Sequence, residues 1–508
     1  MTKHTAHIVV AGGGYVGLYT ARRLQRRLRR ELRSGDVRIT VVSPDPYMTY
    51  QPFLPEAAAG SLSPRHVVVP LRRVLPHCRI LPGEIVGADP ESRTAMVRTA
   101  AGAEAGSEPL RLDYDELVLA PGSLARTLPV PGLAEGGIGF KNIEEAIGLR
   151  NHVLEQLDIA SSTRDSDVRD AALTFVFVGG GYAGVEALAE LEDMARYACR
   201  HYPNIRPEEQ KWLLVEATDR ILPEVGSEMG GYAVRELRGR NIDVRLTTRL
   251  VSYERGTVAL DDGSRYPART LVWTAGVKPH PVLAECGVPL DERGRVRCDA
   301  DLRVTGVAHV WAAGDAAAVP DLAAARNTLD QPGETAPGRT GTPPPTAVEE
   351  RAGTAGRTIE RAPRETTSGA NAPGAHTPHT GARSPMCAPN AQHAVRQARR
   401  LADNLAATLS DKPTTDYRHR HAGSVASLGL HKGVARVYGR RLKGFPAWLV
   451  HRVYHLSRVP TGNRKARVLA EWALAGLFKR EIVSLGSLEH PRAEFELAAD
   501  PGRRRKRP

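Results

Sequence analysis

The residues with the clearest chemical potential are two glycine clusters with G-x-G-x-x-G spacing. The clusters comprise Gly12, Gly14 and Gly17 in the first case, and Gly179, Gly181 and Gly184 in the second. In such a motif the first glycine permits a tight turn and the second lets backbone approach a pyrophosphate. The third lets the following helix pack closely on the strand. The near-identical sequences GGGYVG and GGGYAG therefore predict two dinucleotide sites in one chain.

The residues that follow the next strand of each unit differ. After the second cluster, the run WLLV (212–215) ends at Glu216, whose carboxylate suits the free 2′-hydroxyl of NADH and would repel the 2′-phosphate of NADPH. After the first cluster, the run VRITVV (37–42) is followed by Ser43 and, two residues on, Asp45. Ser43 can accept one hydrogen bond, and we expect Asp45 to reach the ribose from a shifted position.

Each glycine cluster lies between a predicted buried strand and a predicted helix. The apolar runs 7–11 and 173–178 have the length and character of strands buried in a parallel sheet. Leu18, Leu24 and Leu28 follow the first cluster at helical spacing, and residues 185–198 follow the second. This order predicts an α/β fold with two Rossmann-like domains.

Composition narrows the classes of protein further. Of the 508 residues, 41% are apolar, and the net charge of +13 suits a membrane surface, a nucleic acid or an acidic cofactor, although a coding bias toward arginine would also produce it. The five cysteines contain no C-x-x-C pair, which indicates a reducing compartment and removes the simplest disulfide-reductase or zinc signature. No apolar run reaches the 18 residues of a membrane-spanning helix, and we expect no metal site.

The amino-acid composition changes twice in the last third of the chain. Residues 321–386 are rich in Pro, Gly, Thr and Ala, which predicts a disordered insertion. Two later stretches, 445–456 and 468–478, carry Trp and Phe at helical spacing with basic residues nearby. Such faces suit the plane of a membrane interface, with packing on the protein's own core or in a homodimer as the alternative. The final residues, 503–507, form a basic run.

Several motifs together resemble those of a known group of flavoproteins. Besides the glycine clusters, the chain has the loop YQPFLPEAAAG and strands ending in TAGVK and AAGD. These resemble the two-dinucleotide-binding flavoproteins, and most of all the type II NADH dehydrogenases, the single-chain NADH:quinone oxidoreductases. The resemblance implies FAD on the first cluster and NADH on the second. It extends the expected cofactor-binding set to Gln51, Gly276, Gly314 and Asp315.

The same resemblance implies where the quinone binds. The stretch AQHAVR (391–396) is similar to the family's A-Q-x-A-x-Q motif, although its sixth residue is Arg396 and glutamine follows at 397. We expect Glu186 and Gln392 to line the site and Lys432 to stabilise the charge of a reduced quinone. Electrons would pass from NADH through FAD to a membrane quinone, menaquinone or ubiquinone, without proton pumping.

These expectations define a domain plan and its rivals. We predict an FAD-binding domain in three parts (1–125, 296–320 and 387–440, the last including the quinone side) and an NADH-binding domain at 126–295. The insertion (321–386), membrane-associating helices (441–495) and basic tail (496–508) complete the plan, for a peripheral protein on the cytoplasmic face of the cell membrane that binds no nucleic acid. The alternatives are a sulfide:quinone oxidoreductase, a soluble NADH-dependent ferredoxin or rubredoxin reductase, and a flavin redox sensor.

Overall fold

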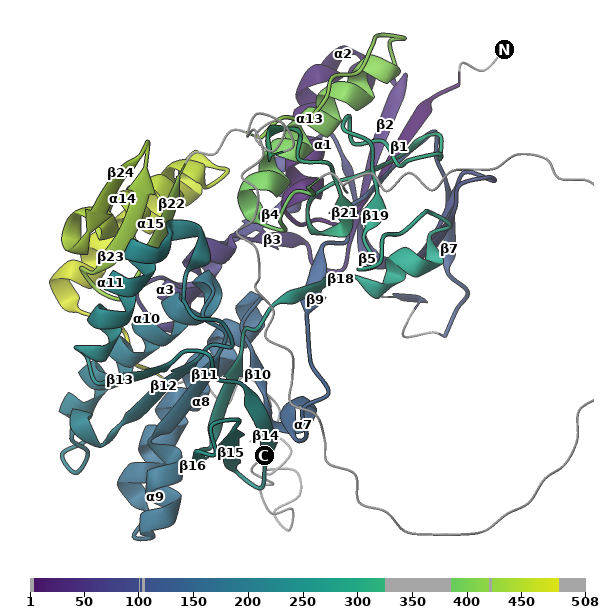
Figure 1. Cartoon of the computed structure of the whole chain (residues 1–508). Coiled ribbons are helices and arrows are strands. Elements are labelled where there is room, and N and C mark those ends of the chain that lie inside the picture. The colour runs from purple at the N-terminus through teal and green to yellow at the C-terminus, as the bar shows by residue number, and fades with distance from the viewer. Residues whose placement is uncertain (1–3, 100, 103–105, 325–384, 420–422, 484–508) are drawn as a thin grey trace, which may run out of the picture.

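Two parallel sheets organise the chain in the computed structural model, which describes residues 4–99, 101–102, 106–324, 385–419 and 423–483. Figure 1 shows the two sheets as separate layered units, with the C-terminal elements beside them. The basic tail and nearly all of the predicted insertion lie outside the described residues. The predicted α/β class with two Rossmann-like units is confirmed.

The first sheet has seven strands, and its centre is parallel. Its spatial order is β20 (Val310–Ala312), β8 (Glu116–Leu119), β1 (Ala6–Ala11), β2 (Val37–Ser43), β5 (Arg79–Asp89), β6 (Thr94–Thr99) and β7 (Leu110–Asp113). β5, β6 and β7 form an antiparallel meander at one edge. Ile8, Val9 and Val10 of β1 are fully buried in the hydrophobic core of the first unit.

The second sheet has five parallel strands and is built from contiguous chain. Its spatial order is β10 (Ile138–Gly139), β17 (Thr270–Trp273), β11 (Thr174–Val178), β12 (Lys211–Val215) and β13 (Ile242–Arg245). A three-stranded antiparallel sheet adjoins it, made of β14 (Leu250–Glu254), β15 (Thr257–Leu260) and β16 (Arg265–Pro267).

Long helices pack on these sheets. They are α1 (Tyr15–Arg27) and α13 (Ala391–Thr408) on the first unit, and α8 (Ile143–Ser162), α10 (Tyr182–Ala198) and α11 (Ser227–Arg238) on the second. The shorter elements are α2 (Arg29–Ser34), β3 (Tyr47–Thr49), α3 (Leu54–Ala58), α4 (Pro64–Val67), β4 (Val68–Pro70), α5 (Leu71–Val74), α7 (Leu133–Gly136), α9 (Ser166–Ala172), β19 (Val296–Arg297) and β21 (Ala317–Ala318). α1 and α13 lie side by side although they are far apart in the sequence, and Arg23 of α1 pairs at 2.7 Å with Asp403 of α13, 380 positions further along the chain.

A two-stranded ribbon joins the two units. The chain leaves the first unit through β9 (Ser123–Ala125) and returns through β18 (Val277–Pro279), which pairs with β9 antiparallel. After the return, Leu283 and Cys286 are buried in the hydrophobic core of the first unit. This return lies before residue 295, where the domain plan placed the boundary.

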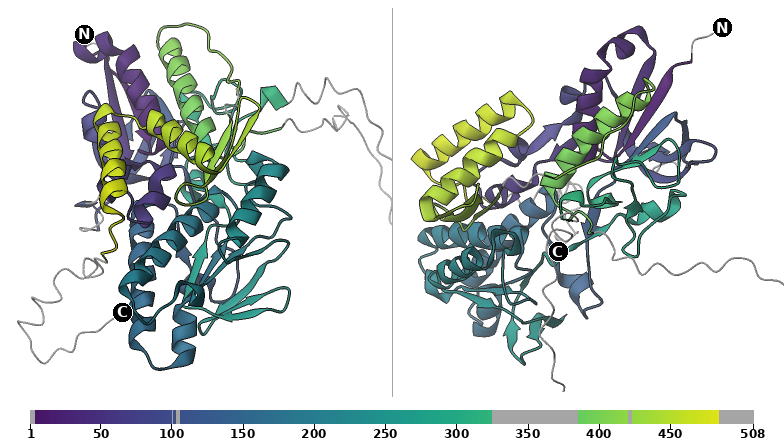
Figure 2. Two further views of the ribbon diagram at one scale, coloured as in Figure 1. Left: turned by 90° about the vertical axis from the view of Figure 1, so that its left-hand side faces the viewer. Right: turned by 45° about the horizontal axis from the view of Figure 1, so that its top comes forward.

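The C-terminal elements form a third, smaller unit. It consists of β22 (Ser424–Ser427), β23 (Gly433–Val437), β24 (Arg440–Lys443), α14 (Gly444–Arg458) and α15 (Gly462–Phe478). Figure 2 shows this unit in yellow-green next to both of the larger ones, and α14 packs on the β22–β23–β24 sheet. Within the described part of the chain, no helix has the length and apolar content needed to cross a bilayer.

Candidate functional site

The first glycine cluster forms a turn that only glycine can make. Gly12 has a φ of +121°, and a Cβ placed there would lie 2.0 Å from the carbonyl oxygen of Ala120. A Cβ on Gly17 would lie 1.8 Å from the carbonyl oxygen of Gly12, so the first turn of α1 sits directly on the loop. A Cβ on Gly14 would meet nothing within 4 Å, which leaves its backbone open to a ligand.

The second cluster repeats this geometry closely. Gly179 has a φ of +116°, and a Cβ on Gly184 would lie 2.0 Å from the carbonyl oxygen of Gly179. Gly181, like Gly14, has open space where a Cβ would be. Both turns begin a helix whose N-terminal N–H groups suit a pyrophosphate.

The strand ends beside the two turns differ as the sequence indicated. Glu216 follows β12, and its carboxylate accepts hydrogen bonds from the backbone N–H of Gly180 at 2.6 Å and of Thr218 at 2.8 Å. Ser43 ends β2, is buried, and has its hydroxyl against Gly13, where a Cβ would lie 2.4 Å away. Asp45 is exposed and is not among the residues lining the cavity described next.

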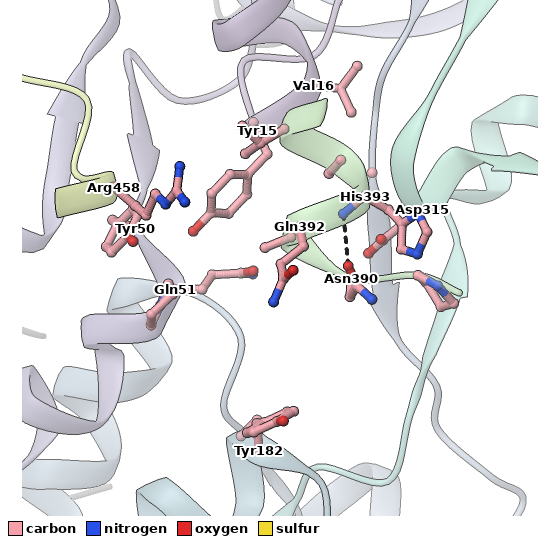
Figure 3. Close-up of a pocket in the computed structure, with 18 of the residues that line it drawn as sticks. Tyr15, Val16, Tyr50, Gln51, Tyr182, Asp315, Asn390, Gln392, His393 and Arg458 are labelled. Atoms are coloured by element: carbon pink, nitrogen blue, oxygen red, sulfur yellow. Dashed lines mark hydrogen bonds between the residues drawn. The ribbon is translucent and has the colours of Figure 1, made fainter. Parts of the chain in front are cut away.

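One cavity of about 1100 Å³ reaches from Gly14 of the first glycine turn to Tyr182 and Ala183, the residues that directly follow the second turn. Its walls come from all three units, and they include Gly14, Gln51, Asp315, Tyr182, Glu186, Gly276, Gln392 and Arg458. In Figure 3 the side chains of Tyr15, Gln51 and Gln392 point into the same space, with Tyr182 across from them. The hydroxyl of Tyr15 is buried without a hydrogen-bond partner in the structure.

A polar chain runs along the wall nearest the first turn. Lys141 Nζ donates to Ser123 Oγ at 2.6 Å, and Ser123 Oγ donates to Asp315 Oδ2 at 2.6 Å. Burial lowers the pKa of the Lys141 ammonium, while Asp315 and Glu145 oppose that shift. Asp315 is thereby held in place next to Gly314, whose N–H donates to Gln397 Oε1 at 2.7 Å.

Glu186 occupies the wall nearest the second turn. It is 6% exposed, and its Oε1 accepts a hydrogen bond from the backbone N–H of Ser427 at 2.8 Å. The same oxygen lies 3.1 Å from Nε2 of His451 on α14. A strand and a helix distant in sequence therefore fix this carboxylate at the cavity wall.

Gln392 is the second residue of α13 and lines the cavity. Its Nε2 donates to the carbonyl oxygen of Gly423 at 3.0 Å, while its Oε1 is buried without a hydrogen-bond partner in the structure. Gln397, one position beyond the family's second glutamine, is buried at 1% exposure and faces Gly314. Arg396 occupies the motif's sixth position and lines the cavity.

Lys432 is not brought to this site. Its ammonium lies 3.1 Å from Glu236 Oε2, is 43% exposed, and is not among the cavity-lining residues described. The reason is local: Lys432 lies in the turn between β22 and β23, and that turn projects toward α11.

Sequence reasoning missed several cavity residues. Lys141 and Tyr182 carry no motif signal beyond their places next to a strand and a glycine turn, and His451 approaches Glu186 from 265 positions away in the chain. All five cysteines are described and free, and none is among the residues found to line the cavity.

Comparison with known proteins identifies the family. A family model described as pyridine nucleotide-disulphide oxidoreductase matches residues 6–331. The chain belongs to this family. Among curated relatives of this family member is the type II NADH:quinone oxidoreductase of Staphylococcus saprophyticus, 26% identical over 461 residues, which cover 89% of this chain and 95% of the relative. A probable NADH dehydrogenase of Dictyostelium discoideum is 30% identical over 294 residues, which cover 57% of this chain and 64% of that protein.

Solved structures agree with the fold of this family member. NDH2 from Plasmodium falciparum in complex with NADH superposes with a TM-score of 0.77 at 17% identity, covering 94% of this chain and 100% of the other. The sulfide:quinone oxidoreductase of Aquifex aeolicus gives a TM-score of 0.62 at 16% identity, covering 94% and 96%. The resemblance to type II NADH dehydrogenases that the motifs indicated is thus confirmed.

Proposed function

We propose that this chain is an FAD-dependent oxidoreductase that passes electrons from NADH to a membrane quinone without pumping protons. One observation carries the proposal: a single cavity runs from Gly14 of the first glycine turn to Tyr182 and Glu186 at the start of α10, directly after the second turn, and Gln392 lines it too. Two dinucleotides bound at those turns would meet in one enclosed space, where a third, flat molecule can also enter. The relatives named as NADH:quinone oxidoreductases support this reading.

The first turn fits FAD. Gly14 leaves the space for a pyrophosphate, and Gly12 and Gly17 could carry no larger side chain. Asp315 and Gln51 lie along the same cavity and would hold the ribityl chain and the ring region of the flavin. The bound flavin would supply the two-electron chemistry, and the chain's own residues would orient it and exclude water.

The second turn fits NADH, and Glu216 is expected to set the preference for NADH over NADPH. Its carboxylate is held by the N–H of Gly180, which leaves oxygen lone pairs for ribose hydroxyls. Replacing Glu216 with glutamine should raise KM for NADH by about tenfold, since charge-assisted hydrogen bonds contribute about 1.5–3 kcal/mol. KM for NADPH should rise less or fall, because the repulsion of a 2′-phosphate is gone.

Steady-state kinetics with both nucleotides measure this preference. An Asp261→Asn variant, changing a carboxylate at the edge of the β14–β15 hairpin, provides the control. An equal change in both KM values in the Glu216 variant would contradict the assignment.

The electron acceptor is the part of the proposal that most needs a direct test. Purified, flavin-loaded protein in liposomes should oxidise NADH rapidly when menaquinone or ubiquinone analogues are present, with NADPH compared in parallel. Oxidation of NADH only with ferredoxin or rubredoxin would favour a soluble reductase, and negligible turnover with every acceptor would favour a redox sensor. A sulfide:quinone oxidoreductase would need cysteines beside the flavin. None of the five cysteines is among the residues that line the cavity.

The C-terminal helices support attachment to a membrane surface. Phe445, Leu449 and Val453 form an exposed row along α14, and Leu477 and Phe478 at the end of α15 are 74% and 77% exposed. Such rows suit the acyl boundary of a bilayer. The cytoplasmic face is the side where NADH is available, so we assign the protein there as a peripheral membrane protein.

Removing apolar side chains from these rows should release the protein from lipid. A Leu449→Ser, Val453→Ser, Phe478→Ser variant should lose more than about tenfold in affinity for liposomes, since each buried apolar side chain contributes about 1.5–3 kcal/mol. Co-sedimentation with vesicles measures this, and Val251→Ser, an exposed apolar residue of β14, is the control. Unchanged sedimentation together with a change from dimer to monomer would instead assign the face to a homodimer.

A further inference from the structure

Three carboxylates are buried together where α3, α10 and α14 meet. Glu56 is 3% exposed, Glu186 is 6% exposed, and Glu190 is fully buried. Burying charged groups is costly unless each charge is balanced by a partner. The partners of these three acids therefore decide how many protons the cluster holds.

Two of the three acids are matched by arginines. Arg452 Nη2 lies 3.2 Å from Glu56 Oε2, and Arg480 Nη2 lies 3.1 Å from Glu190 Oε2. Arginine keeps its charge in proteins, so these two pairs are fixed ion pairs.

The third acid, Glu186, faces a group that can gain or lose a proton. Its Oε1 lies 3.1 Å from Nε2 of His451, which is only 2% exposed, and neither ring nitrogen of His451 has a hydrogen bond with good geometry in the structure. A histidine beside a carboxylate can hold a proton near neutral pH. Glu186 and His451 are thus the part of the cluster that can change its proton content.

Glu186 and His451 lie one behind the other as seen from the cavity. Glu186 lines the cavity, whereas His451 lies behind it and is not among the lining residues described. Beyond His451 the ring of His455 follows at 4.5 Å, and Tyr50 Oη lies 3.4 Å from His455 Nδ1. His455 and Tyr50 line the cavity again, so a file of ring side chains behind Glu186 leads from one part of the wall to another.

We propose that His451 stores the proton that Glu186 delivers to the reduced quinone. This inference rests on the proposed function. The overall reaction, NADH + H⁺ + quinone → NAD⁺ + quinol, takes two electrons and one proton from NADH and one proton from solvent. In the proposed step the Nε2–H bond of His451 breaks as an O–H bond forms on Glu186. The Glu186 proton then forms the second O–H bond of the quinol, and water reloads the pair.

Other charged and titratable groups surround the pair and shape its titration. α3 contributes Glu56, α10 contributes Tyr182 and Glu190, α14 contributes Arg452 and His455, and the segment after α15 contributes Arg480. Burial raises the pKa of the Glu56 carboxyl, and enclosure of His455, with the charge of His451, holds its pKa well below the ordinary value. His455 is therefore poorly suited to hold the proton, and Glu56 stays paired with Arg452.

The test compares two electron acceptors in a His451→Gln variant. The glutamine amide can still donate toward Glu186 but cannot supply a proton. Flavin-loaded protein is assayed for NADH oxidation with a water-soluble quinone, which takes up protons, and with ferricyanide, which takes up electrons alone. His152→Gln, a half-buried histidine that contacts Thr270 in the second unit, is the matched control.

The proposal predicts a pH-dependent loss that affects one acceptor. Quinone turnover of His451→Gln should fall at least about tenfold near pH 8 but less than about threefold near pH 6, where solvent supplies protons at a higher concentration, in keeping with the size of general-acid effects. Ferricyanide turnover, flavin content and the melting temperature should match the control. A Glu186→Gln, His451→Gln double variant should be no slower than Glu186→Gln alone, because the two residues act as a unit.

Two results would overturn the proposal while leaving the proposed function intact. One is a quinone pH profile of His451→Gln that equals that of the control. The other is a loss of the same size with both acceptors, which would make His451 a structural residue. Failure of the unmodified protein to reduce any quinone would instead refute the proposed function, and with it this inference.

Discussion

Replacing Gly184 with alanine should give a protein that keeps its flavin and loses most of its NADH oxidation. The new Cβ would lie 2.0 Å from the carbonyl oxygen of Gly179, so the start of α10 must move away from the loop that would hold the pyrophosphate. Because misplacing a binding group by about 1 Å can cost on the order of a hundredfold in rate, kcat/KM for NADH should fall by about that much or more. Absorbance of bound flavin and NADH kinetics measure the two effects separately.

The first cluster provides the reciprocal experiment. A Cβ on Gly17 would lie 1.8 Å from the carbonyl oxygen of Gly12, so Gly17→Ala should be purified with little or no flavin. Gly148→Ala is the control for both, because a Cβ at Gly148 within α8 meets nothing within 4 Å. Loss of flavin from Gly184→Ala, or its retention in Gly17→Ala, would reverse the assignment of the two nucleotides.

The second large effect concerns stability. Arg452 lies between the rings of Trp448 and Trp472, at 4.4 and 4.7 Å from their centroids, and pairs with Glu56, which also accepts from Trp472 Nε1 at 2.6 Å. Arg452→Met should lower the free energy of unfolding by about 3–5 kcal/mol, because it leaves a buried carboxylate without its cation. Denaturant unfolding followed by tryptophan fluorescence measures the change.

The pH dependence of that loss has a defined sign. Burial raises the pKa of Glu56 in the folded protein, and loss of Arg452 removes the interaction that opposes this shift. The folded variant then holds a proton that the unfolded chain releases, so its stability falls as pH rises above the ordinary range of a carboxyl group. Glu56→Gln, Arg452→Met should recover much of the stability, and Arg441→Met, at an exposed pair with Glu228, should change little. Equal losses in the single and double variants would contradict this account.

Local sequence patterns predicted the strands and glycine turns because these elements are determined by residues close together in the sequence. The run VRITVV became β2 (Val37–Ser43), WLLV became most of β12 (Lys211–Val215), and both glycine turns have the predicted geometry. Each of these elements depends on neighbours within a few residues: apolar runs, turn glycines and helical spacing. The stretch TLVWTAGVK, in contrast, is divided between β17 and β18, because the chain crosses between the two units at Gly276.

The site's remaining residues depend on contacts that no local pattern encodes. Glu186 is fixed by Ser427 and His451, and Lys141 is fixed by Ser123, so their surroundings exist only after distant segments pack. Lys432 shows the converse, since a basic residue near the expected site turned out to pair with Glu236 instead. Sequence spacing could not show which side of its turn would face the cavity.

The C-terminal helices illustrate a third limit. The apolar and aromatic residues of α14 read as one face in the sequence, but Trp448 and Arg452 pack inward while Phe445, Leu449 and Val453 face outward. Helical spacing identifies which residues lie on the same face of a helix. It does not show how much of that face will be buried against the rest of the protein.

The ribbon of β9 and β18 has a consequence for the order in which the protein is made. All strands of the second sheet lie between residues 138 and 273, so that sheet can close while the rest of the chain is still being synthesised. The first sheet cannot, because its edge strand β20 and the helix α13 that covers α1 emerge more than a hundred residues after β9. Domains fold as units as they leave the ribosome. The first unit, where synthesis begins, is therefore completed after the second. A nascent chain acquires its nicotinamide-binding unit before it can retain a flavin.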